Sequence, residues 1–243
     1  METDGLQSRF VELLQKRDIH ITENQLNQFE TYYRELVVWN ANMNLTGITK
    51  REEVYIKHFY DSSSLAFFIP FGKISSLADI GSGAGFPGIP LKILYPHIKL
   101  VIVDSLNKRI QFLEHLVQAL KLSDVNCVHG RAEDIGLLPQ YRDSFDLVTA
   151  RAVARLNILN ELCLPFAKVG GFFASMKGAD PAEEINEAEF SACQLNSRLF
   201  KVSFVELPGD QSKRHLVIYE KLKATPKKYP RKAGIPSKNP LRA

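Results

Sequence analysis

The residues with the clearest chemical character form a glycine-rich turn after an apolar stretch of the chain. The apolar run at residues 74–80 is typical of a buried strand, and a helical pattern begins soon after the turn. Glycine at a strand-to-helix turn permits positive φ and lets a ligand approach the main chain closely. The next apolar run, at 99–103, ends in an acid at the right distance to bind a ribose. This arrangement predicts a nucleotide-type cofactor site that includes Gly81, Gly83, Gly85, Gly88 and Asp104.

The identity of the nucleotide depends on how the glycines are spaced. Residues 83–88 match the dinucleotide pattern G-x-G-x-x-G, which would suit NAD or FAD. In dinucleotide-binding proteins the first glycine of this pattern ends the strand, and here the residue at that position is Gly81. Counted from Gly81, the third glycine of the pattern is replaced by Phe86. Asp79 precedes Gly81 by two residues, and an acid there favours a cationic ligand, such as the amino-acid end of S-adenosylmethionine, over a pyrophosphate. The loop resembles motif I of the class I S-adenosylmethionine-dependent methyltransferases, and a dehydrogenase stays an alternative.

The composition is that of a globular protein without signs of a metal site, a membrane span or secretion. The 243 residues are 45% hydrophobic and 24% charged, which allows a full core. Cys127, Cys163 and Cys193 have no C-x-x-C spacing and no paired histidines, which indicates reduced thiols in a cytoplasmic protein and no metal. The N-terminus lacks an apolar signal segment, and no run approaches the roughly 18 apolar residues that a membrane span requires.

Helical patterns dominate the first third of the chain. Apolar spacing predicts helices at 6–16, from 22 to about 44, and at 51–68. The second of these helices begins with a capping box at residues 22–25. Because three helices of this length would be marginal alone, we expect residues 1–72 to form a helical cap on the domain that follows.

Strand and helix patterns alternate from residue 74 onward. The strands are expected at 74–80, 99–104, 125–129, 145–150, 172–176, 200–206 and 215–221, with helices at 88–95, 107–121, 156–168 and 181–198. Strands separated by helices predict a mostly parallel sheet, whereas the short turn after residue 207 makes the last two strands pair antiparallel. This is the methyltransferase variant of the α/β, Rossmann-like doubly wound fold, with seven strands over residues 73–221.

The carboxyl ends of the strands bring further candidates to one edge of the sheet, where ligands of open α/β sheets bind. The loop backbone is expected to bind the methionine end of the cofactor, and Asp104, followed by Ser105, the ribose hydroxyls. The turn Ala132-Glu133 is placed to contact the adenine, and Phe86 is expected to pack on the cofactor. Taken singly, Asp104 could instead cap the next helix, and Glu133 could be a solvated acid.

The turn after the fourth strand, Thr149-Ala150-Arg151-Ala152, narrows the methyl acceptor. It lacks the [N/D/S]-P-P-[Y/F] turn of enzymes that methylate exocyclic amines and the Pro-Cys setting of pyrimidine C5 enzymes. Guanine N7 fits better, because it has a free lone pair and no proton to lose, so that catalysis would consist of alignment. Arg151 would steer a guanine or a phosphate, or it would form a structural ion pair with Asp146 or Glu133.

Five sequence motifs occur in the order found in one bacterial family. They begin at Trp39, His58, Asp79, Asp104 and Arg151. Over about residues 6–221 the chain resembles the RsmG (GidB) family of 16S small-subunit ribosomal RNA guanine-N7 methyltransferases. The resemblance implies a monomeric cytoplasmic enzyme that uses S-adenosylmethionine to methylate one guanine of 16S rRNA. It implies cofactor contacts at Gly81, Phe86, Ala132, Glu133 and Arg151, which for Arg151 competes with the steering role.

The N-terminal helices supply candidates for the substrate side of the site. Asn40 and Asn44 lie near a predicted helix end, and His58 and Asp61 fall on one face of the third helix. Our hypothesis is that Asn44 and His58 line the substrate pocket and act with Arg151 in catalysis. The alternatives are a helix cap for the asparagine and a pair that fastens the core for the histidine.

The C-terminal end has a charge unlike the rest of the chain. Residues 221–243 contain eight lysines and arginines and no acid, although the whole chain has a net charge of only +4. We expect residues 222–243 to form a basic tail that binds rRNA phosphates or is merely solvated; its candidate contacts are Lys227, Lys228, Arg231 and Lys232. The alternative functions are a methyltransferase for another RNA or a small molecule, and a non-catalytic RNA- or ribosome-binding protein.

Overall fold

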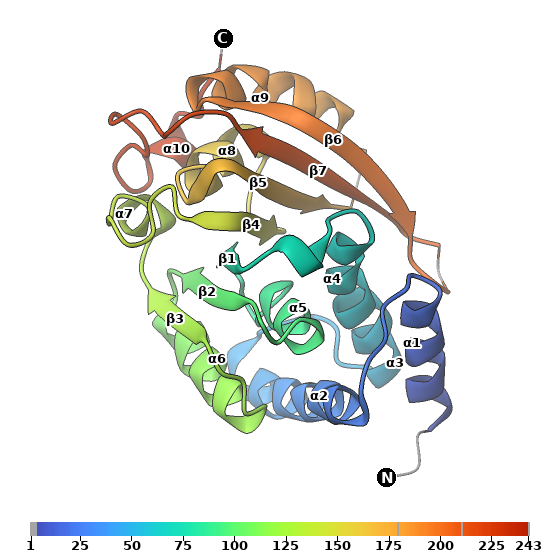
Figure 1. Ribbon diagram of the computed structural model, residues 1–243. Helices are drawn as coiled ribbons and strands as arrows, with labels where there is room; N and C mark the ends of the chain where they lie inside the picture. The colour runs from blue at the N-terminus through green and yellow to red at the C-terminus, as the bar shows by residue number, and fades with distance from the viewer. Residues whose placement is uncertain (1–3, 179, 210, 243) are drawn as a thin grey trace.

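A seven-stranded sheet separates two layers of helices (Figure 1). The computed structural model describes residues 4–178, 180–209 and 211–242. The strand order is β3-β2-β1-β4-β5-β7-β6; β7 runs antiparallel to its two neighbours β5 and β6, and the other neighbouring strands pair parallel. The predicted parallel sheet with a terminal antiparallel hairpin is therefore confirmed. The strands are β1 (Ser76–Ile80), β2 (Lys99–Asp104), β3 (Val125–His129), β4 (Phe145–Arg151), β5 (Ala167–Lys177), β6 (Ser197–Glu206) and β7 (Lys213–Lys221).

The helices cover both faces of this sheet. They are α1 (Gly5–Gln15), α2 (Glu23–Met43), α3 (Arg51–Val54), α4 (Asp61–Ser63), α5 (Gly88–Leu94), α6 (Asn107–Ala119), α7 (Ala132–Ile135), α8 (Leu156–Cys163), α9 (Ala182–Gln194) and α10 (Ile235–Lys238). Shorter helical turns are η1 (Tyr55–Tyr60), η2 (Ser64–Phe67) and η3 (Phe71–Lys73). The N-terminal helices with α5 and α6 cover one face, and α7 to α9 cover the other (Figure 1).

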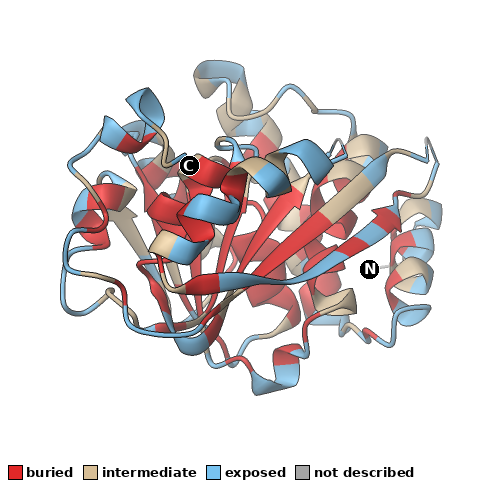
Figure 2. Ribbon diagram, turned by 90° about the horizontal axis from the view of Figure 1, so that it is seen from above, coloured by how far each residue is buried: buried red, intermediate tan, exposed pale blue. Residues whose placement is uncertain are grey.

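The N-terminal helices share their core with the sheet. One buried cluster joins Phe10 of α1 and Phe29 of α2 to Leu77 of β1, and all three side chains are fully buried. Figure 2 shows the same pattern, with the central strands buried and the outer helix faces exposed. Burial of this apolar surface, at about 25 cal/mol per Å², holds the N-terminal helices in place against the sheet.

Several element boundaries differ from those predicted. The helix expected at 156–168 ends at Cys163, because Pro165 has no N–H to continue it. Strand β5 begins at Ala167 rather than at residue 172, and its pairing with β4 shifts register between Phe145 and Leu147. Helix α9 ends at Gln194, and β6 begins at Ser197. The helix expected at 51–68 is a continuous helical run that includes the π-helical turn η1.

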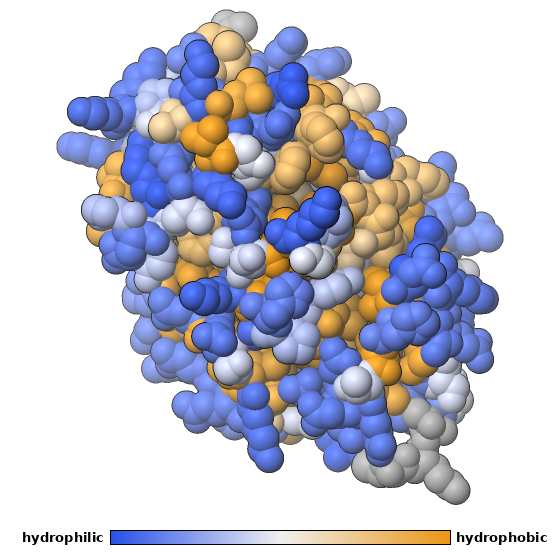
Figure 3. Space-filling view, viewed as in Figure 1, coloured by the Kyte–Doolittle hydropathy of each residue, from blue (hydrophilic) through white to orange (hydrophobic). Residues whose placement is uncertain are grey.

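The C-terminal segment packs against the sheet domain. The Arg142 guanidinium donates hydrogen bonds to the carbonyl oxygens of Thr225, Pro226 and Tyr229 at 2.9–3.1 Å. Because Arg142 precedes β4, these bonds hold the first part of the segment near the amino end of that strand. On the face shown in Figure 3 hydrophilic side chains predominate, and an apolar area lies at the upper right, over β6 and β7.

Candidate active site

The parallel strands β1, β2, β3 and β4 all end at one edge of the sheet, and a cavity of about 250 Å³ lies there. Among the predicted cofactor residues, those that line the cavity are Gly81, Asp104, Ser105, Ala132 and Glu133. Those that do not line it are Asp79, Gly83, Gly85, Phe86 and Arg151, as well as Asn44 and His58. Sequence analysis did not single out the lining residues Val153 and Arg131, whose positions depend on how the loops after β4 and β3 fold over the edge.

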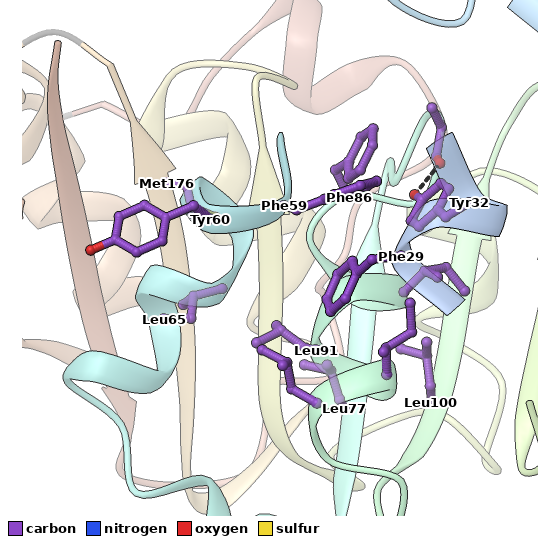
Figure 4. Close-up of a cluster of buried hydrophobic side chains, with 14 of the residues drawn as sticks. Phe29, Tyr32, Phe59, Tyr60, Leu65, Leu77, Phe86, Leu91, Leu100 and Met176 are labelled. Atoms are coloured by element: carbon purple, nitrogen blue, oxygen red, sulfur yellow. Dashed lines mark hydrogen bonds between the residues drawn. The ribbon is translucent and has the colours of Figure 1, made fainter. Parts of the chain in front are cut away.

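The glycine turn requires glycine at two positions for different reasons. Gly81 has φ +70°, and a Cβ there would lie 2.8 Å from Cγ2 of Val153. The backbone at Gly81 is therefore in close contact with Val153, a residue of the cavity wall. Gly85 has φ +100°, and a Cβ there would lie 2.6 Å from the hydroxyl oxygen of Tyr32. The Tyr32 hydroxyl donates a hydrogen bond to the carbonyl oxygen of Ala84 (2.6 Å), which ties helix α2 to the turn (Figure 4).

Asp79 braces the turn from below and has no surface exposed to solvent. Its Oδ2 accepts hydrogen bonds from the Ser82 hydroxyl and from the Gly88 N–H (2.8 Å). Its Oδ1 is buried without a hydrogen-bond partner among the described residues. Burial raises the pKa of Asp79 to about 6, although the two hydrogen bonds and the nearby Arg151 oppose this effect. The carboxylate therefore places negative charge beneath the turn.

Asp104 lies on the cavity wall at the end of β2. Its carboxylate accepts hydrogen bonds from the N–H groups of Gly83 (3.0 Å) and Leu106 (2.9 Å), so one acid links the turn to the start of α6. Arg109 is 3.4 Å from the same carboxylate and also lines the cavity. Asp104 thus lines the cavity, where its contact with a ribose stays a prediction, and the alternative that it caps α6 is wrong, because the N-cap position is Leu106 and has no side-chain cap.

Glu133 is a buried cavity residue whose partner comes from the C-terminal segment. Its Oε1 accepts a hydrogen bond of 2.8 Å from the N–H of Gly234, which lies 101 positions further along the chain. The same segment is fixed by Arg231, which donates to both carboxylate oxygens of the fully buried Glu161. The basic tail thus braces a wall of the cavity, a role that its composition did not indicate.

Arg151 at the end of β4 lies between the sheet and the N-terminal helices. Its Nη1 donates to Asp61 Oδ2 (3.1 Å), and Arg214 Nε lies 3.4 Å from the other oxygen of that acid. The structural pairing of Arg151 therefore goes to Asp61, and the expected alternatives Asp146 and Glu133 are wrong. Because one buried acid faces two guanidinium groups, this cluster has a net positive charge.

His58 and Phe86 pack against Arg151. The Arg151 guanidinium lies 4.8 Å from the centre of the Phe86 ring, and the imidazole of His58 stacks on the same ring with the two centres 4.5 Å apart. His58 Nε2 is hydrogen-bonded to the Thr46 hydroxyl (2.8 Å), and Nδ1 lies 3.1 Å from the Lys57 carbonyl oxygen. Burial, and then the charge of Arg151, lower the pKa of His58 to about 3, so the ring is neutral at physiological pH.

Asn44 ends helix α2 in the left-handed conformation, with φ 49° and ψ 52°. Its N–H bonds the carbonyl oxygen of Asn40, and its side chain is exposed. The neighbouring Asn40 accepts a hydrogen bond from the Thr46 N–H (2.8 Å), which shapes the turn that presents Thr46 to His58. The structure thus places Asn44 at the helix end, outside the cavity.

The four predicted RNA contacts have different surroundings. Lys227 and Lys232 are exposed. Lys228 bonds Gln194 and lies over the ring of Tyr229, and Arg231 is engaged with Glu161. The described residues contain no group of three or more acids, histidines and cysteines that could hold a metal ion, and no described helix is long and apolar enough to cross a membrane.

Solved structures share this architecture. An O-methyltransferase from Thermotoga maritima described as SAM-dependent superposes with a TM-score of 0.52 at 16% identity, over 79% of this chain and 72% of its own. The M. jannaschii protein TYW2, solved in complex with AdoMet, gives a TM-score of 0.50 at 18% identity, over 68% of this chain and 76% of its own. With the glycine turn after β1 and the acid at the end of β2, the chain has the class I methyltransferase fold.

The chain belongs to the rRNA small subunit methyltransferase G (GidB) family, whose model matches residues 25–217. It is 54% identical to ribosomal RNA small subunit methyltransferase G of Brevibacillus brevis, over 96% of this chain and 98% of that relative. Identity to the Staphylococcus carnosus protein of the same name is 55%, over 95% and 97% of the two chains. The predicted family, enzyme class and S-adenosylmethionine cofactor are thereby confirmed. The unmatched share is smaller than residues 222–243, so the matches extend into the C-terminal segment.

Proposed function

We propose that the protein methylates N7 of a guanine in 16S rRNA, as a monomer acting on the rRNA or on the small ribosomal subunit. The observation that supports this acceptor is the lack of a free base beside Arg151 among the described residues. His58 has a pKa of about 3, so its ring is neutral, and its two nitrogens lie beside the Thr46 hydroxyl and the Lys57 carbonyl oxygen. The Asp61 carboxylate pairs with Arg151 and Arg214. Guanine N7 needs no proton removed, so alignment of its lone pair suffices.

The cavity has the chemistry that S-adenosylmethionine requires. Asp104 offers carboxylate oxygens to ribose hydroxyls, and the Glu133 carboxylate on the same cavity wall would accept a hydrogen bond from the adenine amino group. Ile80, Val103 and Leu162 supply apolar walls for the base. When bound, the cofactor supplies an electrophilic methyl group on a cationic sulfur.

The residues around the cavity have distinct roles in this proposal. Asp79, buried beneath the turn, would attract the cationic end of the cofactor. Arg151, between β4 and the N-terminal helices, orients the guanine or its phosphate, with Asp61 holding the guanidinium in position. His58 acts through its bond to Thr46, and Asn44 acts through the left-handed helix end that begins the turn.

The test is transfer of labelled methyl groups from S-adenosylmethionine to unmodified 16S rRNA or small subunits, followed by nucleoside analysis. We expect 7-methylguanosine, and we expect Glu133→Gln to weaken cofactor binding whereas Asp134→Asn, an exposed acid beside it, leaves binding unchanged. Label in another nucleoside, or in a small molecule only, would refute guanine N7 as the acceptor. Equal effects of the two substitutions would refute the role of Glu133.

The exposed lysines of the C-terminal segment are proposed to bind rRNA phosphates. Because Arg231 and Gly234 brace the core, neutral substitutions test this better than a deletion of the segment. The slope of log affinity against log salt should flatten by about 0.7–0.9 for each lysine that no longer neutralises a phosphate. We expect this for Lys227→Gln and Lys232→Gln, and an unchanged slope would show that these lysines are merely solvated.

A further inference from the structure

The end of the β6–β7 hairpin exposes an aromatic side chain beside cations, at the same edge of the sheet as Arg151. Phe204 on the edge strand β6 is 47% exposed, and its neighbour Val202 is 43% exposed. Lys213 Nζ lies 5.8 Å from the centre of the Phe204 ring, and the ring of His215 lies 5.5 Å from it. The apolar area over β6 and β7 in Figure 3 includes this part of the fold.

The sheet register connects this surface to the active site. Arg151 pairs with Met176 across β4 and β5, Lys177 pairs with His215 across β5 and β7, and His215 pairs with Phe204. With strands about 4.8 Å apart, Phe204 lies three strand spacings, about 15 Å, from Arg151. Both residues thus lie at the edge where the methyl acceptor must enter, with Arg151 on the face of the N-terminal helices and Phe204 on the face of α7 to α9.

The charge at this edge of the sheet is complementary to RNA. On the face of the N-terminal helices, Arg151 and Arg214 share Asp61 and His58 is neutral, so this part of the edge has a net positive charge. Lys213 adds a further cation, with Glu206 as its cross-strand neighbour. An exposed aromatic ring beside cations is the arrangement with which proteins stack unpaired bases and bind the adjoining phosphates.

We propose that Phe204 and Lys213 bind single-stranded rRNA next to the target nucleotide, with a base stacked on Phe204 and a phosphate held by Lys213. This inference rests on the proposed function, because it takes rRNA as the substrate. Single-stranded sites on proteins extend over about 4–16 nucleotides, so one RNA segment can span from Arg151 to Phe204. The hairpin would then hold the flanking strand while the guanine enters the site.

Phe200 on the same strand provides a matched control. It is 54% exposed, but the register shift between Leu199 and Lys201 places it differently from Phe204. Its ring contacts Phe172, which packs with the core of the N-terminal helices, 5.2 Å away. Val202 pairs with Val217, whose side chain belongs to the buried cluster on the face of α7 to α9. Phe204 lies two residues further along β6 and so is on that same face. Phe200 and Phe204 therefore point to opposite faces of the sheet.

The experiment compares Phe204→Ala, Phe204→Trp and Phe200→Ala in steady-state methylation of 16S rRNA, with thermal melts to confirm folding. We expect Phe204→Ala to raise the KM for rRNA about fivefold to tenfold, with kcat and the Kd of S-adenosylmethionine unchanged, and Phe204→Trp to retain the KM of the parent. Lys213→Gln should flatten the salt dependence of binding by about 0.7–0.9. An unchanged KM in Phe204→Ala, or an equal rise in Phe200→Ala, would overturn the proposal.

Two further readouts separate this inference from its competitors. If no 7-methylguanosine forms at all, the proposed function fails, and binding of 16S rRNA by the variants still tests the surface. If the parent protein is a dimer in solution and Phe204→Ala dissociates it, the surface is occupied by a second copy of the chain, and the RNA assignment is overturned.

Discussion

Replacement of Asp79 by asparagine should make the stability of the protein less dependent on pH. The folded carboxyl has a pKa of about 6 because it is buried, whereas an unfolded aspartate titrates near 3.8. Between these values the folded state binds more protons than the unfolded state, so the free energy of unfolding falls as pH rises and is constant above about pH 7. Asparagine has no such titration.

The magnitude follows from the difference in pKa. A shift of about two units corresponds to about 3 kcal/mol, of which about 2 kcal/mol is lost between roughly pH 4.5 and pH 7.5. Asparagine can still accept the bonds from Ser82 and Gly88, although its amide nitrogen would replace an unpartnered oxygen and cost about 1–3 kcal/mol. That cost is the same at every pH, so the pH-dependent difference between the two proteins is unaffected.

The assay is urea unfolding of the parent and Asp79→Asn at pH values across this window and below it. Asp146→Asn is the matched control, because the pKa of Asp146 is lowered: partial burial raises it, but hydrogen bonds from Lys168 and from the N–H groups of Ser75 and Ser76 prevail. As pH rises, Asp79→Asn should become more stable relative to the parent, whereas Asp146→Asn should become less stable at the acid end of the range. Parallel curves for the parent and Asp79→Asn would refute the raised pKa.

Three further predictions test other parts of the structure. Arg231→Ala leaves the fully buried Glu161 without its guanidinium and should lower the free energy of unfolding by about 3 kcal/mol in urea titrations; a loss below about 1 kcal/mol would show that water replaces the partner. Gly81→Ala places a Cβ 2.8 Å from Val153 at positive φ, so calorimetry should show weaker binding of S-adenosylmethionine, and unchanged affinity would contradict the close approach. His58→Gln should leave the shape of the pH–rate profile between about pH 6 and 8 unchanged, because the ring is neutral there, and loss of a step near pH 6.5 would contradict this.

Local patterns are enough to predict the fold because strands, turns and helices are set by nearby residues. The glycine turn, the acid after the second strand and the short link between the last two strands each constrain the backbone within a few positions. Right-handed crossovers and antiparallel hairpins then leave few topologies. Apolar spacing alone predicts the end of α8 wrongly, because the helical pattern of apolar residues continues beyond Pro165 although the helix ends before it.

The sequence by itself determined the class of site, because Gly81, Asp104 and Glu133 follow strands whose carboxyl ends must meet at one edge. Only the tertiary structure decided how each charge is used. It buried Asp79 beneath the turn, paired Arg151 with Asp61 and placed the C-terminal segment against Glu133. These contacts join residues up to 101 positions apart, and their energies depend on burial and on which groups compete for each partner. Neither quantity exists until the chain is folded.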